Sequence, residues 1–138
     1  MIDLRYFRLI CYKAAERTGG RVVEFRVAAG VAPNFHQGII AYRDRRVAVV
    51  CNRDSEVLAV AEPRVIEFVD EARDSGPLVF VDAPDLVSVL GQWPRFRVLS
   101  AAELNGRFDP AAWPGIDPTD LEYWKPVTLG EALFNYWD

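Results

Sequence analysis

The chain has 138 residues, of which 51% are hydrophobic and 26% are charged, and its formal net charge is −4 with a pI near 5.0. This length and composition fit one globular domain, residues 1–138, with one hydrophobic core, and they exclude a disordered chain. The negative net charge argues against general binding to nucleic acid or to anionic membranes, because both need positive charge.

The first half of the chain predicts one helix followed by antiparallel strands. Apolar residues recur three and four apart near the N-terminus, which indicates an amphipathic helix that ends at Gly19 and Gly20. Alternating apolar and charged residues, and then two apolar runs around a charged tip, indicate a half-buried strand and a β-hairpin. The elements expected here are a helix at 3–17, strands at 21–28, 38–42, 47–52 and 57–61, and a loop at 29–34.

The second half predicts helices that alternate with strands. Pro63 and Pro84 stand at expected first positions of helices, and Ser100 and Thr128 each precede a Glu by three residues, as in a capping box. The run 78–81 is apolar throughout, which is typical of a central strand. The elements expected here are a helix at 63–76, a strand at 78–81, a helix from Asp82 and Pro84 to near Gln92, a strand at 96–99, a short helical turn after Ser100, an irregular but packed stretch at 105–127, and a terminal helix with Leu129, Leu133 and Trp137 on one side.

Together these elements predict an α+β fold, with mixed α/β as the alternative. We expect a single central sheet that contains antiparallel hairpin strands and has helices packed on it. Cys11 falls in the helical pattern and Cys51 ends an apolar run, so both are expected to be small core residues. The N-terminus has no hydrophobic signal region and no apolar run is long enough to span a bilayer, so a cytoplasmic protein is expected.

The side chains offer no evident reaction centre. His36 is the only histidine and could act as a general base, but we expect a loop residue that makes one hydrogen bond. Asp82 and Asp85 fall at a helix start, where carboxylates interact with free amides and the helix dipole. Metal-ligand spacings and glycine-rich phosphate loops are missing from the sequence, so we expect no cofactor, no metal and no enzymatic activity.

Two charged features remain. Arg43, Arg45 and Arg46 form a basic knot at the hairpin tip, where we expect a solvated turn that discourages edge pairing. The second feature is a division of charge, because residues 1–53 carry ten Lys and Arg against four Asp and Glu, whereas residues 54–138 carry six against sixteen. The first part therefore has a net charge of +6 and the second a net charge of −10.

Acidic and aromatic residues interleave toward the C-terminus. Protein interfaces favour Trp and Tyr as anchors, and the surrounding negative charge would steer encounter with a basic partner. We do not expect a catalytic carboxylate pair among these residues. Phe134 and Trp137 are expected to fix the last helix to the core. The residues expected to bind a partner are Asp117, Asp120, Glu122, Tyr123, Trp124 and Asp138.

The last residues, Gly130-Glu131-Ala132-Leu133-Phe134-Asn135-Tyr136-Trp137-Asp138, follow the sequence Trp124-Lys125-Pro126. This stretch resembles the C-terminal signature of small immunity proteins from actinobacterial polymorphic toxin systems. The resemblance implies a protein that is encoded beside a secreted toxin, stays in the cytoplasm of the producing cell and blocks the active site of the toxin. It supplies a role and does not identify contact residues.

The leading hypothesis is therefore an immunity-type protein that binds and occludes a cognate secreted toxin, for which a nuclease and an NAD-degrading enzyme are two candidates. The partner would be a basic protein, the inhibitor a monomer or weak dimer, and neither nucleic acid nor membrane would be bound. The alternative is a small ligand-binding domain or enzyme with a pocket near His36. A third hypothesis is a structural or regulatory module that self-associates through the apolar hairpin.

Overall fold

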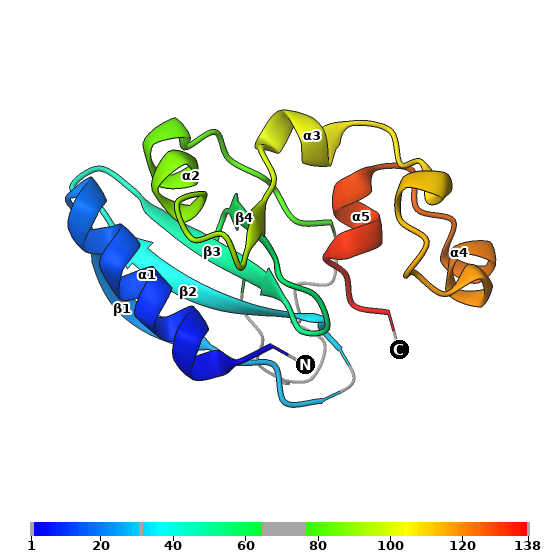
Figure 1. Ribbon diagram of the computed structural model, residues 1–138, viewed down its shortest axis with the longest axis horizontal. Helices are drawn as coiled ribbons and strands as arrows, with labels where there is room; N and C mark the ends of the chain where they lie inside the picture. The colour runs from blue at the N-terminus through cyan, green and yellow to red at the C-terminus, as the bar shows by residue number, and fades with distance from the viewer. Residues whose placement is uncertain (1, 31, 65–76, 138) are drawn as a thin grey trace.

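The computed structural model describes residues 2–30, 32–64 and 77–137. Within these ranges a mixed five-stranded sheet is combined with helices, which confirms the predicted α+β fold (Figure 1). The strands are β1 (Arg21–Arg26), β2 (Phe35–Ala41), β3 (Arg46–Asn52), β4 (Val57–Ala61) and β5 (Arg97–Val98). The helices are α1 (Leu4–Thr18), α2 (Pro84–Leu90), α3 (Ala101–Asn105), α4 (Pro118–Trp124) and α5 (Leu129–Leu133), with a 3₁₀ turn, η1, at Pro110–Ala112.

The order of strands in the sheet follows their order along the chain. Strands β1 to β4 pair as antiparallel neighbours, as the predicted hairpin requires. Strand β5 pairs with β4 in parallel, and α2 lies in the connection between the two. A parallel neighbour needs such a crossover, because a tight turn can join only antiparallel strands.

Both faces of the sheet are buried, which explains why the middle strands are continuous apolar runs. Successive residues of a strand point to opposite faces. Val47, Val49 and Cys51 therefore pack in the core beneath α1 and α2, while Ala48 and Val50 pack in the core beneath α3 and α5. The hairpin of β2 and β3 is paired on both edges and buried on both faces, so it has no apolar surface left for self-association.

The expected core cysteines and the expected helix ends are present. Cys11 and Cys51 are free thiols buried in the first core. Gly19 ends α1 with a φ of 77°, a left-handed conformation that only glycine adopts without strain. Ser100 and Glu103 form the complete capping box that opens α3.

The run 78–81 is not a central strand. Phe80 makes only an isolated antiparallel bridge to Ala61, and Val79 is 47% exposed. Strand β5 occupies the other part of the same edge of β4, which leaves this run no length of edge on which to form a ladder. Its apolar character serves packing instead, because the Phe80 ring lies 5.9 Å from that of Phe134 in the second core.

Helix α2 begins without the acidic cap that the sequence suggested. Ala83 is the N-cap residue and provides no side-chain hydrogen bond, while Asp85 alone brings an acidic group into the first turn. Asp82 precedes the cap, so its carboxylate makes no capping bond to the helix. The helix expected at 63–76 lies, from residue 65 on, outside the described residues.

The C-terminal third also differs from expectation. The stretch 105–127 contains α4 and η1 rather than only irregular chain. Helix α5 ends at Leu133, because Phe134 has an extended backbone with φ of −129° and ψ of 103°. Trp137 therefore does not continue the face of α5 that bears Leu129 and Leu133.

Helix α5 packs so closely against Phe80 and Leu104 that it needs a glycine at position 130. Gly130 is buried, and a Cβ atom at this position would overlap the ring of Phe80 and lie 3.1 Å from the carbonyl oxygen of Leu104. The absence of a side chain thus lets α5 pack directly on the segment after β4 and on α3.

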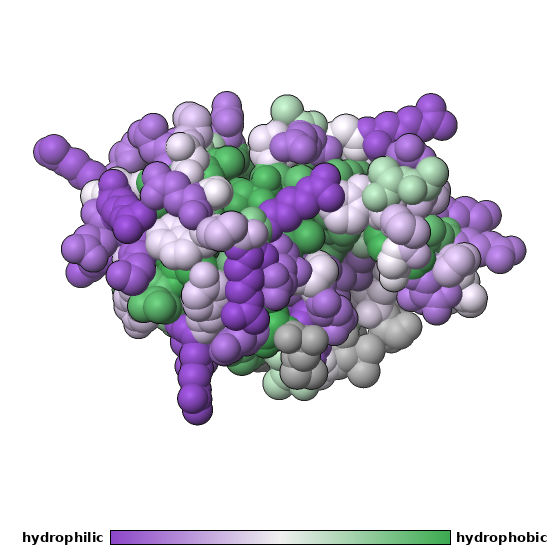
Figure 2. All heavy atoms as spheres, in the orientation of Figure 1, coloured by the Kyte–Doolittle hydropathy of each residue, from purple (hydrophilic) through white to green (hydrophobic). Residues whose placement is uncertain are grey.

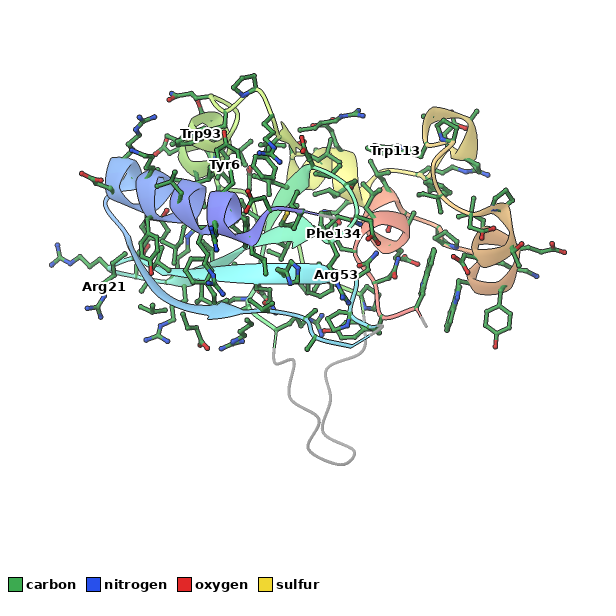
Figure 3. All side chains as sticks on the ribbon, turned by 60° about the horizontal axis from the view of Figure 1, so that its bottom comes forward. Tyr6, Arg21, Arg53, Trp93, Trp113 and Phe134 are labelled. Atoms are coloured by element: carbon green, nitrogen blue, oxygen red, sulfur yellow. The ribbon has the colours of Figure 1, made fainter. Side chains whose placement is uncertain are left out.

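The β2–β3 hairpin tip and the C-terminal helices lie at different ends of the molecule (Figure 1). Arg21, at the start of β1, lies at one end, while Trp113, which follows η1, lies toward the other (Figure 3). Hydrophilic residues project from both ends of the face seen in Figure 2, and hydrophobic residues reach the surface between them. The exposed arginines of the hairpin tip, beside Arg21 at the end of the β1–β2 pair, are Arg43, Arg45 and Arg46.

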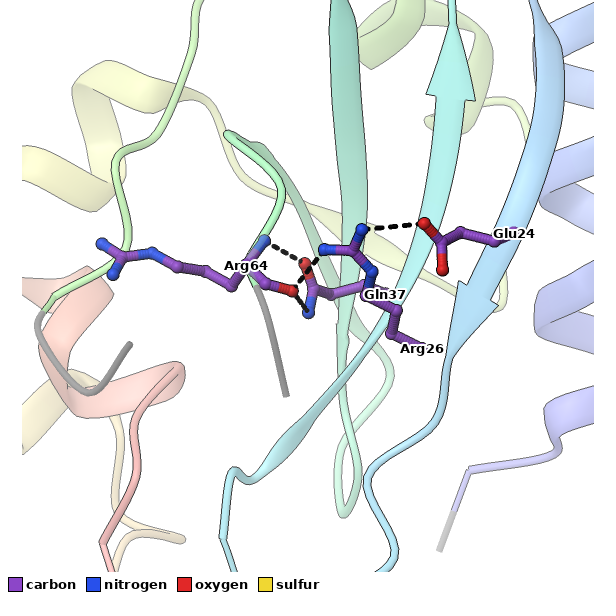
Figure 4. A network of polar contacts seen from close by, with 4 residues as sticks. All are labelled: Glu24, Arg26, Gln37 and Arg64. Carbon is purple, nitrogen blue, oxygen red and sulfur yellow. Dashed lines mark hydrogen bonds and ion pairs between the residues drawn. The ribbon is translucent and has the colours of Figure 1, made fainter. Parts of the chain in front are cut away.

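A buried polar network joins the sheet to the chain after β4 (Figure 4). Gln37 is fully buried in β2, and its side-chain oxygen accepts a hydrogen bond of 2.7 Å from the backbone nitrogen of Arg64. Its side-chain nitrogen donates one of 2.9 Å to the carbonyl oxygen of the same residue. Arg26 donates to that oxygen at 2.6 Å and pairs with Glu24 at 2.7 Å. The Gln37 amide is therefore satisfied as a backbone group would be in a sheet.

Candidate partner-binding site

Three asparagines, which we call the asparagine clamp (Asn34, Asn52 and Asn135), tie the C-terminal segment to the end of the β2–β3 hairpin. The amide nitrogens of Asn34 and Asn52 both donate to the carbonyl oxygen of Leu133, at 3.1 and 2.6 Å. The Asn135 backbone nitrogen donates to Oδ1 of Asn34 at 2.8 Å, and its carbonyl oxygen accepts from the Asn34 backbone nitrogen at 2.9 Å. A carbonyl oxygen has two lone pairs, so Leu133 accommodates both amides.

Asn135 also organises the chain on either side of it. Its amide nitrogen donates to the carbonyl oxygens of Glu131 and Ala132, at 3.0 and 3.2 Å, at the end of α5. Its Oδ1 accepts from the backbone nitrogen of Trp137 at 3.2 Å. The end of α5 and the last described residue are therefore held in one geometry by one buried side chain.

The clamp presents Trp137 to α4. The rings of Trp124 and Trp137 stack with 5.9 Å between centroids and an angle of 1° between planes. Tyr123 meets Trp124 edge-on, with centroids 4.9 Å apart. Tyr123 is 76% exposed and Trp124 37%, so these two rings offer apolar area to solvent on the helix at the end of the molecule. This arrangement leaves two adjacent aromatic rings exposed on one short helix.

Helix α4 is stabilised by capping interactions at its ends, because it has no buried face. Asp117 accepts a hydrogen bond of 2.8 Å from the backbone nitrogen of Thr119, and Pro118 occupies the first turn. Lys125 ends the helix in the left-handed conformation, with a φ of 49°. None of the seven helical residues is buried, so capping and the stack of Trp124 on Trp137 must hold this short helix.

A hollow of about 460 Å³ opens between α4, the turn after β3 and the C-terminal segment. We call it the tryptophan hollow, because Trp113 and Trp137 contribute aromatic walls and the asparagine clamp lines its base. Its acidic lining residues are Asp54, Asp117 and Asp120. The lining contains no Lys and no Arg, so the hollow is negative at neutral pH.

The acidic groups around the hollow are available for a partner. Asp54, Asp120 and Glu122 make no side-chain hydrogen bond and no ion pair within the part of the chain that the structure describes. Arg53, next to Asp54 in the sequence, is already engaged, because it donates to the carbonyl oxygens of Gly30 and Pro33. Arg97 lies over the ring of Trp113, at 4.6 Å from its centroid.

His36 is placed where it cannot easily act as a catalyst. It lies in β2 rather than in a loop, is 5% exposed, and does not line the tryptophan hollow. Its Nδ1 accepts a hydrogen bond of 3.0 Å from the backbone nitrogen of Ala28, which is the single bond that the sequence suggested. Burial lowers the pKa of His36 to about 4, and the positive charges of Arg53 and Arg8 act in the same direction. The imidazole is therefore neutral and structural at neutral pH.

The residues predicted to bind a partner are gathered on and beside α4. Asp117 and Asp120 line the hollow, while Glu122, Tyr123 and Trp124 lie on the same helix and are exposed. Asp138 lies outside the described residues. Phe134 is buried in the second core as expected, whereas Trp137 is half-buried and lines the hollow. Sequence reasoning missed the three clamp asparagines and Asp54, for which no local pattern exists.

Three comparisons with known proteins gave no match. No protein-family model, no curated protein and no solved structure matches this chain. No helix among the described residues is long and apolar enough to cross a membrane, and no group of three His, Cys, Asp or Glu side chains among them is arranged to hold a metal ion.

Proposed function

We propose that this protein is an immunity-type inhibitor that binds a cognate secreted toxin and occludes its active site. The observation that carries the proposal is the exposed pair Tyr123 and Trp124, on a helix whose neighbouring carboxylates are unpaired. The C-terminal resemblance supplies the kind of partner. In this role the protein binds rather than catalyses, acts in the cytoplasm of the producing cell, and is a monomer or weak dimer.

The physical case for tight binding rests on exposed rings that are already ordered. Trp and Tyr are the residues most enriched among those whose truncation weakens a protein interface by 2 kcal/mol or more. Trp124 is held by its stack on Trp137, and Trp137 by Asn135, so the partner does not have to order these side chains on binding. A surface that is ordered beforehand loses less conformational entropy on association.

Charge supports a basic target. Asp54, Asp120 and Glu122 stand near the exposed rings without a cationic partner in the described part of the chain. Complementary charge speeds encounter between two proteins and selects the right partner. An enzyme that cleaves nucleic acid must attract a polyanion, so its active-site cleft is basic. We therefore favour a nuclease toxin over one that degrades NAD.

The proposal is tested by co-expression with the toxin encoded in the neighbouring gene. Growth should be rescued by the wild-type chain, and the two proteins should elute together on size exclusion. The double variant Tyr123→Ala, Trp124→Ala should lose rescue, because two interface anchors cost together about 4 kcal/mol, or roughly a thousandfold in affinity. Tyr12→Ala is the matched control, since Tyr12 is 56% exposed on α1 and lies outside the site. Absence of both complex and rescue with the wild-type chain would contradict the proposal.

A further inference from the structure

We infer that the tryptophan hollow receives the side chain of an arginine presented on a loop of the partner protein. The inference rests on the proposed function and names the chemistry by which the partner enters the site. It commits to a peptide-borne guanidinium group rather than to a free small molecule. Three observations support it: the walls, the charge and the base of the hollow.

The walls of the hollow suit a planar cation. Trp is the best of the aromatic residues at attracting a cation to its face, and arginine does this more often than lysine. The guanidinium of Arg97 already lies over one face of the Trp113 ring, so an entering arginine can use only the other face. Trp137 adds a second indole to the lining, and Trp124 backs it by stacking. A guanidinium is also more weakly hydrated than an ammonium, so it enters such a site at less cost.

The charge of the hollow is complementary to that guanidinium. Asp54 and Asp120 come from two different parts of the chain, the turn after β3 and helix α4, and both carboxylates line the hollow without an ion pair in the described ranges. Asp117 adds a third carboxylate, although one of its oxygens already accepts from Thr119. Five N–H donors in a rigid fork allow one arginine to bond to more than one carboxylate at a time.

The base of the hollow is rigid. Asn34, Asn52 and Asn135 line it, and their side-chain amides are already bonded to the end of α5, to the C-terminal segment and to the turn after β3. The clamp fixes the backbone of Trp137 and of Asp54, so these two lining residues are ordered before a partner binds. A volume of about 460 Å³ leaves room for an entering side chain.

The test uses the purified full-length chain and the peptide Gly-Gly-Arg-Gly-Gly with both ends blocked. Nuclear magnetic resonance would follow the four indole N–H signals, assigned by single Trp→Phe variants. The signals of Trp113 and Trp137 should shift with a dissociation constant of roughly millimolar order, because one exposed ion pair and one cation–π contact are each weak. The signal of Trp93, which packs against the first core and lies over no part of the hollow, should not move. The same peptide with citrulline in place of arginine should leave all four signals unchanged.

Variants that remove single charges test whether Asp54 and Asp120 bind the guanidinium. Asp54→Asn combined with Asp120→Asn should weaken arginine-peptide binding by roughly tenfold, as expected for two partly exposed charge pairs. Asp82→Asn removes the same charge from an exposed residue outside the hollow and should change nothing. Equal shifts with the citrulline peptide, or unchanged binding by the double variant, would overturn the inference. Free arginine binding tenfold more tightly than the peptide would also overturn it, because the hollow would then be a small-molecule site.

The two proposals can fail separately. If the wild-type chain rescues growth but the arginine peptide produces no shift, the inference about arginine is overturned and the inhibitor role stands. If the peptide binds as described but the chain neither rescues growth nor forms a complex, the inhibitor role is overturned.

Discussion

Truncating Asn135 should both destabilise the protein and release Trp137. The side chain is 8% exposed and makes three hydrogen bonds: two to carbonyl oxygens at the end of α5 and one from the backbone nitrogen of Trp137. Each such bond contributes about 0.5–1.5 kcal/mol net, and groups left unsatisfied add to the loss. We therefore expect Asn135→Ala to lower the free energy of unfolding by about 2–3 kcal/mol, which for a chain of this size lowers Tm by roughly 10 °C.

Urea and thermal unfolding would measure this loss, and the indole signals of Trp124 and Trp137 would report whether their rings still shield each other. Asn105→Ala is the matched control, because Asn105 is exposed at the end of α3 and makes no side-chain hydrogen bond in the described structure. The control should change stability by less than about 0.5 kcal/mol. If Asn135→Ala behaved like the control and kept the stacked indole signals, the clamp would not be what orders the C-terminal segment.

Three further predictions concern the rest of the fold. Gln37→Leu should cost about 2–3 kcal/mol by urea unfolding, because it leaves the backbone N–H of Arg64 without its partner; an effect below 0.5 kcal/mol, within the ordinary range for surface substitutions, would contradict this. The lowered pKa of His36, about 4, means that the unfolded chain binds more protons between that pH and about 6.5, so stability should fall as the pH is lowered through this window, and His36→Gln should remove that part of the pH dependence. Gly130→Ala should cost about 1–3 kcal/mol, because its Cβ would overlap a phenyl ring, whereas Gly115→Ala, with open space around it, should be nearly neutral in the same assay.

Helices with a clear apolar spacing, a terminal glycine or a capping box were predictable from the sequence. Asp3 was not needed to locate α1, because the apolar spacing and the glycine at its end sufficed, and the capping box at Ser100 located α3. The prediction of a central strand at 78–81 was wrong, because a short apolar segment can pack either as a strand or as a buried connection. The position of β5 on the edge of β4 decides between the two.

The site was predictable only in part. Asp117 is an N-cap residue, and Pro118 follows it in the first turn of the helix. This pair is a recognisable helix start, so α4 could have been predicted despite the other prolines nearby. The clamp could not, because Asn34 and Asn52 bond to a carbonyl that is 99 and 81 residues away in sequence. Contacts at such separations depend on the complete fold, and an asparagine in a loop or at a strand end has many other ordinary explanations.

The most direct test of the central claim is the affinity of the purified chain for its toxin, measured by calorimetry with and without Trp124. We expect Trp124→Ala to weaken binding by roughly 30-fold or more, the equivalent of about 2 kcal/mol, while Tyr12→Ala binds like the wild type. If Trp124→Ala bound the toxin as tightly as the wild-type chain did, the exposed aromatic face of α4 would not be the surface that grips the partner.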